Sequence, residues 1–436
     1  MTSKCNVCFT FFLLCAGLCL WGEEGAGGVL TLQRALERAV ERNLTLEKNA
    51  LDLETARLGA DNLWAQLLPS MSAGGSVGWA TSFTNPPRDG NPTFGVQASV
   101  SLSLNPSLKS TMRIISLAYR SAILDYESGK RQVEIAAAKD YYKLLIERKN
   151  LDVLRDLLAQ TEGQLSQSRT KFRNGFVSEL DAQRSLLAVQ TARFELGRAE
   201  MAAKANVQTF LSAIGYDENV EWELEDRFTI EKIDADADAL IAEYLPRRPD
   251  MQSARQTLER LELQSAQKAL QARAPSLSLS SSWRGTPALA APLSDSFSVS
   301  AGISIPLDSW IPASKDDQSV KAARTDATKA KADVQETERT ARLAIRTLVN
   351  NLSSAWSSVE IARLRVDIAR RALEMTQIAF NNGSEEFLAL QTSRNDLTGA
   401  RQQLLTEELS YKNMSLDLAA ALNREVNDPW TAYTTN

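Results

Sequence analysis

The side chains that most often perform acid–base and metal chemistry are scarce in this sequence. The chain has 436 residues and no histidine, so it lacks the commonest general base and the commonest metal ligand. Its four cysteines, Cys5, Cys8, Cys15 and Cys19, all lie near the start. If export removes that segment, no thiolate nucleophile, disulfide or cysteine metal site remains. Paired carboxylates could still act as acid and base, so an exported enzyme stays the weakest alternative.

One acidic run has a spacing that could suggest calcium. The run Asp234-Ala-Asp-Ala-Asp238 lacks the glycine and the terminal glutamate of a calcium-binding loop, so we interpret it as a solvated linker. We therefore expect no metal and no cofactor.

The balance of charges bears on nucleic-acid binding. Lys and Arg number 49 against 54 Asp and Glu, a formal net charge of −5. Nucleic-acid-binding proteins are normally basic, so we expect no nucleic acid partner.

The first residues indicate an export signal. Lys4 precedes an apolar run that ends at Trp21, and small residues follow it. The run is too short for a comfortable membrane span. We predict that residues 1–22 are a cleaved signal peptide. Lipidation at Cys19 and an uncleaved anchor remain the alternatives.

Short segments recur in the same order at a nearly constant spacing. Leu68-Pro69-Ser70 matches Ala274-Pro275-Ser276, and Trp79 matches Trp283. Residues 94–105 match residues 297–308, and Phe172-Arg-Asn-Gly175 matches Phe380-Asn-Asn-Gly383. The spacings lie between 203 and 208 residues, which indicates an internal duplication. We predict two structural repeats, residues 23–215 and 246–424, joined by a linker at 216–245 and followed by a C-terminal tail at 425–436.

Each copy contains a segment in which apolar residues alternate with small polar ones. This period of two predicts a strand with one apolar and one small polar face. The apolar positions are Phe94, Val96, Ala98, Val100, Leu102 and Leu104, and then Phe297, Val299, Ala301, Ile303, Ile305 and Leu307. Weaker partner strands lie at 73–79 and 277–283, and turn-forming residues predict hairpin loops at 84–92 and 285–292. Such strands could cross a bilayer or cover a helix in an ordinary sheet, and the strand pattern alone leaves both open.

Helical periodicity dominates the rest of the chain. From Ala341 to Leu373 apolar residues recur in steps of four and three, a repeat that supercoils helices around a neighbour. Seven-residue repeats follow each glycine turn, at Leu180, Leu187, Phe194 and Met201, and at Leu390, Leu397, Leu404, Tyr411 and Leu418. This periodicity alone would also fit a soluble coiled coil.

The lengths of these segments add a constraint. Residues 107–175 and 312–383 predict helices of roughly 100 Å, and residues 30–68 and 177–214 predict helices of about 57 Å. Two short helices end to end match one long helix. We predict a mainly α fold with membrane β: a long coiled-coil helical barrel and four strands per chain. Four strands leave open edges in lipid, so we expect other copies of the chain to close them.

These features together resemble the TolC-like outer membrane efflux proteins, also called outer membrane factors. The resemblance rests on the duplication, on Leu67-Leu68-Pro69 before a strand, on Arg248-Pro249-Asp250-Met251 and on the two glycine turns. It implies a homotrimer with a 12-stranded barrel in the outer membrane and a helical tunnel across the periplasm. It also implies export of small molecules or proteins, without bond chemistry, alongside a periplasmic adaptor and an inner-membrane pump.

The resemblance implies roles for particular residues. The adaptor would meet the tips, at Asn174, Gly175, Phe176, Asn382, Gly383 and Ser384. The family commonly narrows its entrance with aspartates six and nine residues past the second glycine, but Ala389 and Thr392 stand there. Asp181, Glu385 and Glu386 are the candidate acids at the entrance instead, although each could simply cap or flank a helix.

The membrane part has candidates of its own. Outer membrane lipid would contact Phe94, Val96, Val100, Leu102, Phe297, Val299, Ile303 and Ile305, and the serine and glycine face would line a lumen. Trp79 and Trp283 suit the membrane interface, or they are ordinary core residues. A periplasmic adaptor or scaffold that never enters lipid is the remaining alternative, but it would lack two alternating hairpins of this length.

Overall fold

The computed structural model describes residues 28–79, 92–216, 222–225, 227–288 and 291–426. The predicted signal peptide, with its four cysteines, and all but two residues of the predicted tail lie outside these ranges. The predicted first hairpin loop also lies outside them, apart from its last residue.

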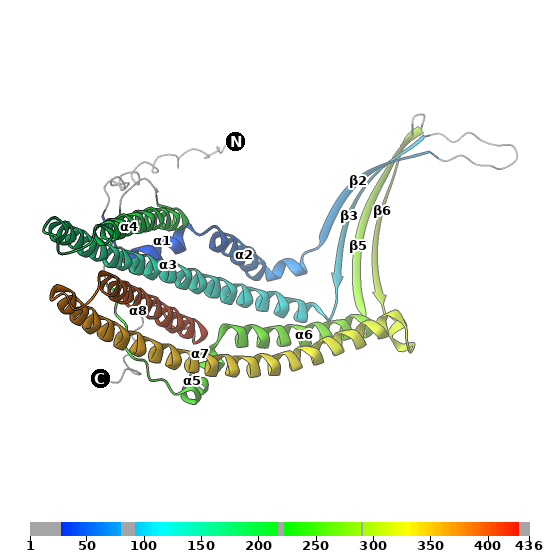
Figure 1. The fold of residues 1–436 in the computed structure, drawn as a ribbon. Coiled ribbons are helices and arrows are strands. Elements are labelled where there is room, and N and C mark those ends of the chain that lie inside the picture. The colour runs from blue at the N-terminus through cyan, green and yellow to red at the C-terminus, as the bar shows by residue number, and fades with distance from the viewer. Residues whose placement is uncertain (1–27, 80–91, 217–221, 226, 289–290, 427–436) are drawn as a thin grey trace, which may run out of the picture.

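Two long helices define the helical part of the molecule (Figure 1). Helix α3 (Leu108–Arg173) has 66 residues and helix α7 (Lys315–Asn381) has 67, so each is about 100 Å long. Shorter helices lie end to end beside them. Helices α4 (Glu179–Ala213) and α2 (Leu44–Asp61) accompany α3, and α8 (Phe387–Ala421) and α6 (Pro249–Arg273) accompany α7.

The helices form a layer that is one helix thick. Near the glycine turns, α3 packs against α4 and α8, and α8 packs against α7, so the order is α4-α3-α8-α7. Near the sheet, the order is α2-α3-α6-α7. Helix α7 is therefore an edge of the layer along its whole length, while α4 and α2 share the other edge.

The first predicted helix is wrong as a single element. Residues 30–68 divide into β1 (Val29–Leu30), α1 (Leu32–Arg42), α2 and a short 3₁₀ segment (Leu63–Leu67). The break falls at Asn43, whose side-chain oxygen accepts from the backbone N–H groups of Thr45 and Leu46, both at 3.0 Å. A short amide side chain competes well for these groups, so it starts a new helix where apolar periodicity predicts continuation.

The four long strands make one antiparallel sheet in the order β2-β3-β5-β6 (Figure 1). They are β2 (Ser70–Trp79), β3 (Pro92–Leu104), β5 (Ser276–Ala288) and β6 (Ala291–Ser304). The loop predicted at 285–292 is wrong, because β5 and β6 continue through most of it and Ala288 pairs with Ala291. The sheet begins at the ends of α3 and α7 that lie farthest from the glycine turns, and its strands extend away from the helices (Figure 1).

Strand register brings serines together in rows across the sheet. One row is Ser72, Ser99, Ser282 and Ser298, and the next is Ser70, Ser101, Ser280 and Ser300. The Oγ atoms of Ser72 and Ser99 lie 2.8 Å apart, and those of Ser280 and Ser300 lie 2.7 Å apart. The polar face of the sheet is therefore a surface of paired hydroxyl groups.

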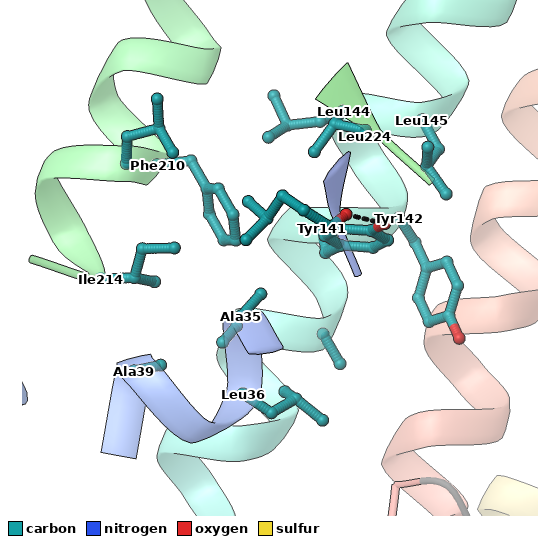
Figure 2. Close-up of a cluster of buried hydrophobic side chains, with 14 of the residues drawn as sticks. Ala35, Leu36, Ala39, Tyr141, Tyr142, Leu144, Leu145, Phe210, Ile214 and Leu224 are labelled. Carbon is teal, nitrogen blue, oxygen red and sulfur yellow. Dashed lines mark hydrogen bonds between the residues drawn. The ribbon is translucent and has the colours of Figure 1, made fainter. Parts of the chain in front are cut away.

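The largest apolar core lies midway along the helices, where α4 ends (Figure 2). Strand β1 pairs in parallel with β4 (Glu223–Leu224), and both lie on α3. The hydroxyl of Tyr141 lies 2.9 Å from the Leu30 carbonyl oxygen and 3.1 Å from that of Glu225. Tyr141 packs on Phe210 at the end of α4, so this one side chain joins β1, the linker and helices α3 and α4.

The predicted linker also packs on the second structural repeat of the chain. The Tyr411 hydroxyl donates to the Glu231 carbonyl oxygen at 2.8 Å and accepts from the Ile233 N–H at 3.0 Å. Helix α5 (Ala237–Tyr244) packs on α7, and Asp238 forms an ion pair with Arg346 at 2.7 Å. Asp236 caps α5, so the acidic run starts a helix and holds it in place.

No helix in the described ranges combines the length and the hydropathy needed to span a bilayer. The same ranges contain no group of three or more acidic, His or Cys side chains arranged for a metal ion.

Removing the Tyr411 hydroxyl is expected to loosen the linker. In Tyr411→Phe two backbone groups lose a partner, at a cost of about 1 kcal/mol for each hydrogen bond. Limited proteolysis should then cut the segment around residues 231–233 faster than in the unmodified protein. Tyr126→Phe is the matched control, because that hydroxyl bonds to no described residue. Equal cutting in both variants would show that the Tyr411 hydroxyl does not hold the linker in place.

Candidate functional site

The two glycine turns have the same backbone geometry. Gly175 has φ +78° and Gly383 has φ +75°, values that only glycine adopts without strain. The N–H of Phe176 donates to the Lys171 carbonyl oxygen at 2.9 Å, and that of Ser384 donates to Ala379 at 3.0 Å. Each turn is thus a Schellman motif that ends a long helix and reverses the chain.

The same motif also ends the two returning helices. Gly215 has φ +76° after α4, and Asn423 has φ +56° after α8. Their numbers differ by 208, as those of Gly175 and Gly383 do. This pair extends the duplication, but the substitution of Asn for Gly hid it from sequence comparison.

Asp181 acts as part of a helix cap. Ser178 is the N-cap of α4: its Oγ accepts from the Asp181 N–H at 3.2 Å and donates to the Asp181 carboxylate at 2.7 Å. Arg184 lies 3.7 Å from the same carboxylate. In the second copy Glu386 is the N-cap of α8 without a side-chain capping bond, and both Glu385 and Glu386 are exposed.

Contacts between the tips join the two copies. The Lys171 ammonium lies 4.6 Å from the centre of the Phe380 ring, and Phe380 packs on Phe387 inside the second tip. Phe176 has no such cover and is 78% exposed. The tip residues Asn174, Asn382, Gly383 and Ser384 are exposed as well. The first tip therefore presents an aromatic side chain to solvent, and the second presents small polar groups.

Polar side chains tie α8 to α3 above the tips. Arg394 donates to Gln164 on α3 at 3.3 Å and to Gln377 on α7 at 2.9 Å. Burial lowers the pKa of the Arg394 guanidinium. Arg401 pairs with Asp156 at 3.3 Å, and Gln402 donates to Asn150 at 3.0 Å. These ties fix the spacing of the two helical hairpins.

One predicted heptad does not pack within the chain. On α8, Leu390, Leu397, Tyr411 and Leu418 are buried, as expected for a coiled-coil seam. On α4 the corresponding side chains are exposed by 58% to 73%, namely Leu180, Leu187, Phe194 and Met201. Helix α4 buries Ser185, Val189 and Ala192 against α3 instead. We call the four exposed residues the α4 stripe.

The residues expected to contact lipid share one face of the sheet. The register places Ala98, Trp283 and Phe297 in one row, and Leu102, Leu279 and Ala301 in another. By alternation Phe94, Val96, Val100, Val299 and Ile303 lie on this face, and Ile305 directly follows β6. These side chains are exposed, apart from the half-buried Leu102. The structure places Trp283 in the middle of a row and not at an end of the sheet.

Two exposed tryptophans lie at the end of the sheet next to the helices, and the sequence pattern did not predict a role for them. Trp64 precedes β2 and is 58% exposed, and Trp310 follows β6 and is 70% exposed. Both occupy short 3₁₀ segments outside any alternating pattern, so the strand periodicity gave no signal for them.

The chain matches the family model described as outer membrane efflux protein over residues 35–216 and 240–424. The chain belongs to the outer membrane efflux protein family. Family membership assigns this efflux protein to the outer membrane and makes it a channel, so the predictions of localisation and of transport without bond chemistry are confirmed.

Named relatives agree with this assignment. The efflux protein is 24% identical to the outer membrane protein TolC of Salmonella enteritidis, over 93% of this chain and 84% of that protein. It is 22% identical to TolC of Escherichia coli strain K12, over 93% and 85%.

Solved structures share the fold. A membrane protein from Pseudomonas aeruginosa aligns with a TM-score of 0.74 and 17% identity, over 92% of each chain. The Campylobacter jejuni CmeC outer membrane channel aligns with a TM-score of 0.72 and 17% identity, over 92% of this chain and 88% of that one. The prediction of long coiled-coil helices with four strands is confirmed.

The glycine turns can be tested by local stability. Gly383→Ala forces a Cβ into the left-handed region, which costs roughly 1–2 kcal/mol, whereas Asn tolerates that region better. Amide hydrogen exchange at the end of α7 should speed up by about tenfold in Gly383→Ala and less in Gly383→Asn. Gly399→Ala, inside α8 with open space around it, should slow exchange slightly. Equal exchange in all variants would show that the turn does not need glycine.

Proposed function

We propose that three copies of this chain form one continuous export duct, with the strands in a closed barrel and the helices in a closed tube. The observation that carries this proposal is the layer itself. It ends on one side at α4 and α2 and on the other at α7, and the sheet ends at β2 and β6. Both pairs of edges require partners that the described part of the chain does not supply.

The two helical edges carry matching apolar surfaces. The exposed side chains Ile361, Leu364, Ile368, Met375 and Ile378 form an α7 stripe. The α7 stripe lies 5 to 22 residues before Gly383, and the α4 stripe lies 5 to 26 residues after Gly175. Both stripes therefore lie at the same distance from the tips. Packing α7 of one copy against α4 of the next buries both, and repeating this head-to-tail contact closes a ring.

The α4 stripe and the α7 stripe are apolar surface that one chain leaves exposed. Contiguous exposed apolar patches mark interaction sites, so the two stripes are the natural seams between copies.

The sheet supports a lumen lined by hydroxyl groups. With four strands from each copy, closure gives a 12-stranded barrel whose apolar face contacts outer membrane lipid. The serine rows then face inward, and a polar interior is what a water-filled path requires. Trp64 and Trp310 are exposed at the end of the sheet next to the helices. They suit the interface between the outer membrane and the periplasm.

We assign the tips to a periplasmic adaptor. The exposed residues Asn174, Gly175, Phe176, Asn382, Gly383 and Ser384 are held by two rigid turns, which favours a fixed docking geometry. Phe176 offers the large aromatic surface that anchors protein interfaces. An inner-membrane pump would act with this adaptor, in a tripartite efflux system or a type I secretion system.

The acidic residues proposed for the entrance differ in exposure and in their contacts. Glu385 and Glu386 are exposed and make no ion pair with a described residue, so three copies could form a negative ring near the tips. Asp181 is half-buried and engaged by Ser178 and Arg184, so its role in a ring would be secondary.

Charge on the α4 stripe should prevent assembly. Leu187→Glu combined with Phe194→Glu places two carboxylates in the proposed seam, and burying unpaired charge costs several kcal/mol. We expect monomers in place of trimers after mild detergent extraction and chemical cross-linking. Gln160→Glu adds charge to an exposed position on α3, which is not an edge helix, and should leave trimers intact. Trimers in the double variant would refute this seam.

The adaptor assignment predicts a loss of export without loss of assembly. Phe176→Ser gives the first tip the residue found at the matching position of the second, and it removes an exposed anchor. Efflux of a pump substrate from cells should fall several-fold, while cross-linked trimers persist, since interface anchors contribute 2 kcal/mol or more. Gln160→Ala, at an exposed position of α3 away from the tips, is the control and should retain export. Full export in Phe176→Ser would exclude this side chain from docking.

A further inference from the structure

The four long strands are almost free of charge. Among their described residues only Arg284 on β5 and Asp295 on β6 are charged. The other polar residues on these strands are serine, threonine and glutamine, which carry no charge. A single cation in such a surface has a large influence on passing ions, because nothing nearby offsets it.

Register places the two charges on opposite faces. Arg284 pairs with Ser296 on β6 and with Gln97 on β3. Two residues earlier, Ser282 pairs with Ser298, so Arg284 lies on the serine face. Asp295 pairs with Gly285, one residue further along, and therefore lies on the apolar face with Val96 and Phe297.

The sheet thus separates Arg284 from the nearest strand carboxylate. Arg284 is exposed, and no described carboxylate forms an ion pair with it. Its cross-strand neighbours are a serine and an amide, which leave the guanidinium charge uncompensated. Gly95 and Gly302 lie on the same face, where the Ser76 and Ser278 hydroxyls lie beside them.

The position along the strand sets the level of the charge. Arg284 is eight residues beyond Ser276, where β5 starts, which corresponds to about 26 Å along the strand. It therefore lies toward the hairpin end of the sheet, far from the helices and from the acidic residues of the tips.

We propose that Arg284 makes the outer part of the lumen selective for anionic solutes. This inference rests on the proposed channel, in which the serine face lines the lumen and three copies set three guanidinium groups at one level. Each charge acts over about 10 Å at 0.1 M salt and about 3 Å at 1 M, so the preference is salt-dependent. The chemical class favoured is a small anion, or a solute with a carboxylate, sulfate or phosphate group.

Thiol labelling in intact cells tests this charge directly. Ser296→Cys places a thiol opposite Arg284, within about 5 Å between Cβ atoms. Its reaction rates with an anionic reagent (sulfonatoethyl methanethiosulfonate) and a cationic one (the trimethylammonium analogue) are compared with and without Arg284→Gln. The ratio of the two rates cancels any effect of Arg284 on thiol ionisation. We expect this anionic-to-cationic ratio to fall about fivefold on Arg284→Gln at low salt, and to be unchanged at 1 M salt.

Two controls separate the possible failures. Val299→Cys lies on the apolar face and should react with neither reagent, and the protein without an introduced cysteine gives the background. A reactive Val299→Cys with an unreactive Ser296→Cys would reverse the faces and refute the proposed channel. A reactive Ser296→Cys whose rate ratio ignores Arg284→Gln at low salt would overturn the charge inference alone. Asp295→Asn should leave the ratio unchanged, and a shift as large as that of Arg284→Gln would also overturn it.

Discussion

A wall one helix thick has no interior, and this constraint governs the whole helical part. Each helix can exclude water only along the narrow seams where it touches a neighbour. Helix α7 shows the consequence, since Ile345, Leu352 and Val359 are buried while Ser353, Ser354 and Ser357 are exposed. A repeat of 3.5 residues keeps such a seam on one side of a long helix, which is why the periodicity is so regular.

The seams alone cannot hold the layer together where helices meet end to end. At that level the chain adds a compact core around Tyr141, built from β1, β4, α1, the middle of α3 and the ends of α4 and α8. Arg248 ties α6 to the end of α8 by donating to the Ala421 carbonyl oxygen at 2.9 Å. Burial tends to raise the pKa of Asp250, but the hydrogen bond and charge of Arg248 outweigh it and hold that pKa below its usual range. The ion pair therefore persists at neutral pH and weakens only in acid.

Duplication produced two copies that share geometry but divide tasks. Their turns superimpose in backbone type, yet Phe176 faces solvent where the second copy has Ser384. Their returning helices use the same heptad spacing, but α8 lies between α3 and α7, whereas α4 lies at an edge. Two identical repeats would bury the same side chains in each. Because the repeats differ, the helices in the middle of this layer are packed on both sides, and its two edges remain apolar and exposed.

The sequence determined the elements, because they depend on local periodicity and turn chemistry. Alternation defined β3 and β6, the four-and-three spacing defined the seam of α7, and the glycines located both reversals. Local signals failed at Asn43, where one capping side chain divides a helix, and at residues 285–292, where turn-forming residues lie within strands. Only the tertiary structure decided which apolar stripes are core and which are edge. Leu187 and Leu397 have the same spacing, but burial depends on which helices lie on either side, and that order is a property of the assembled layer.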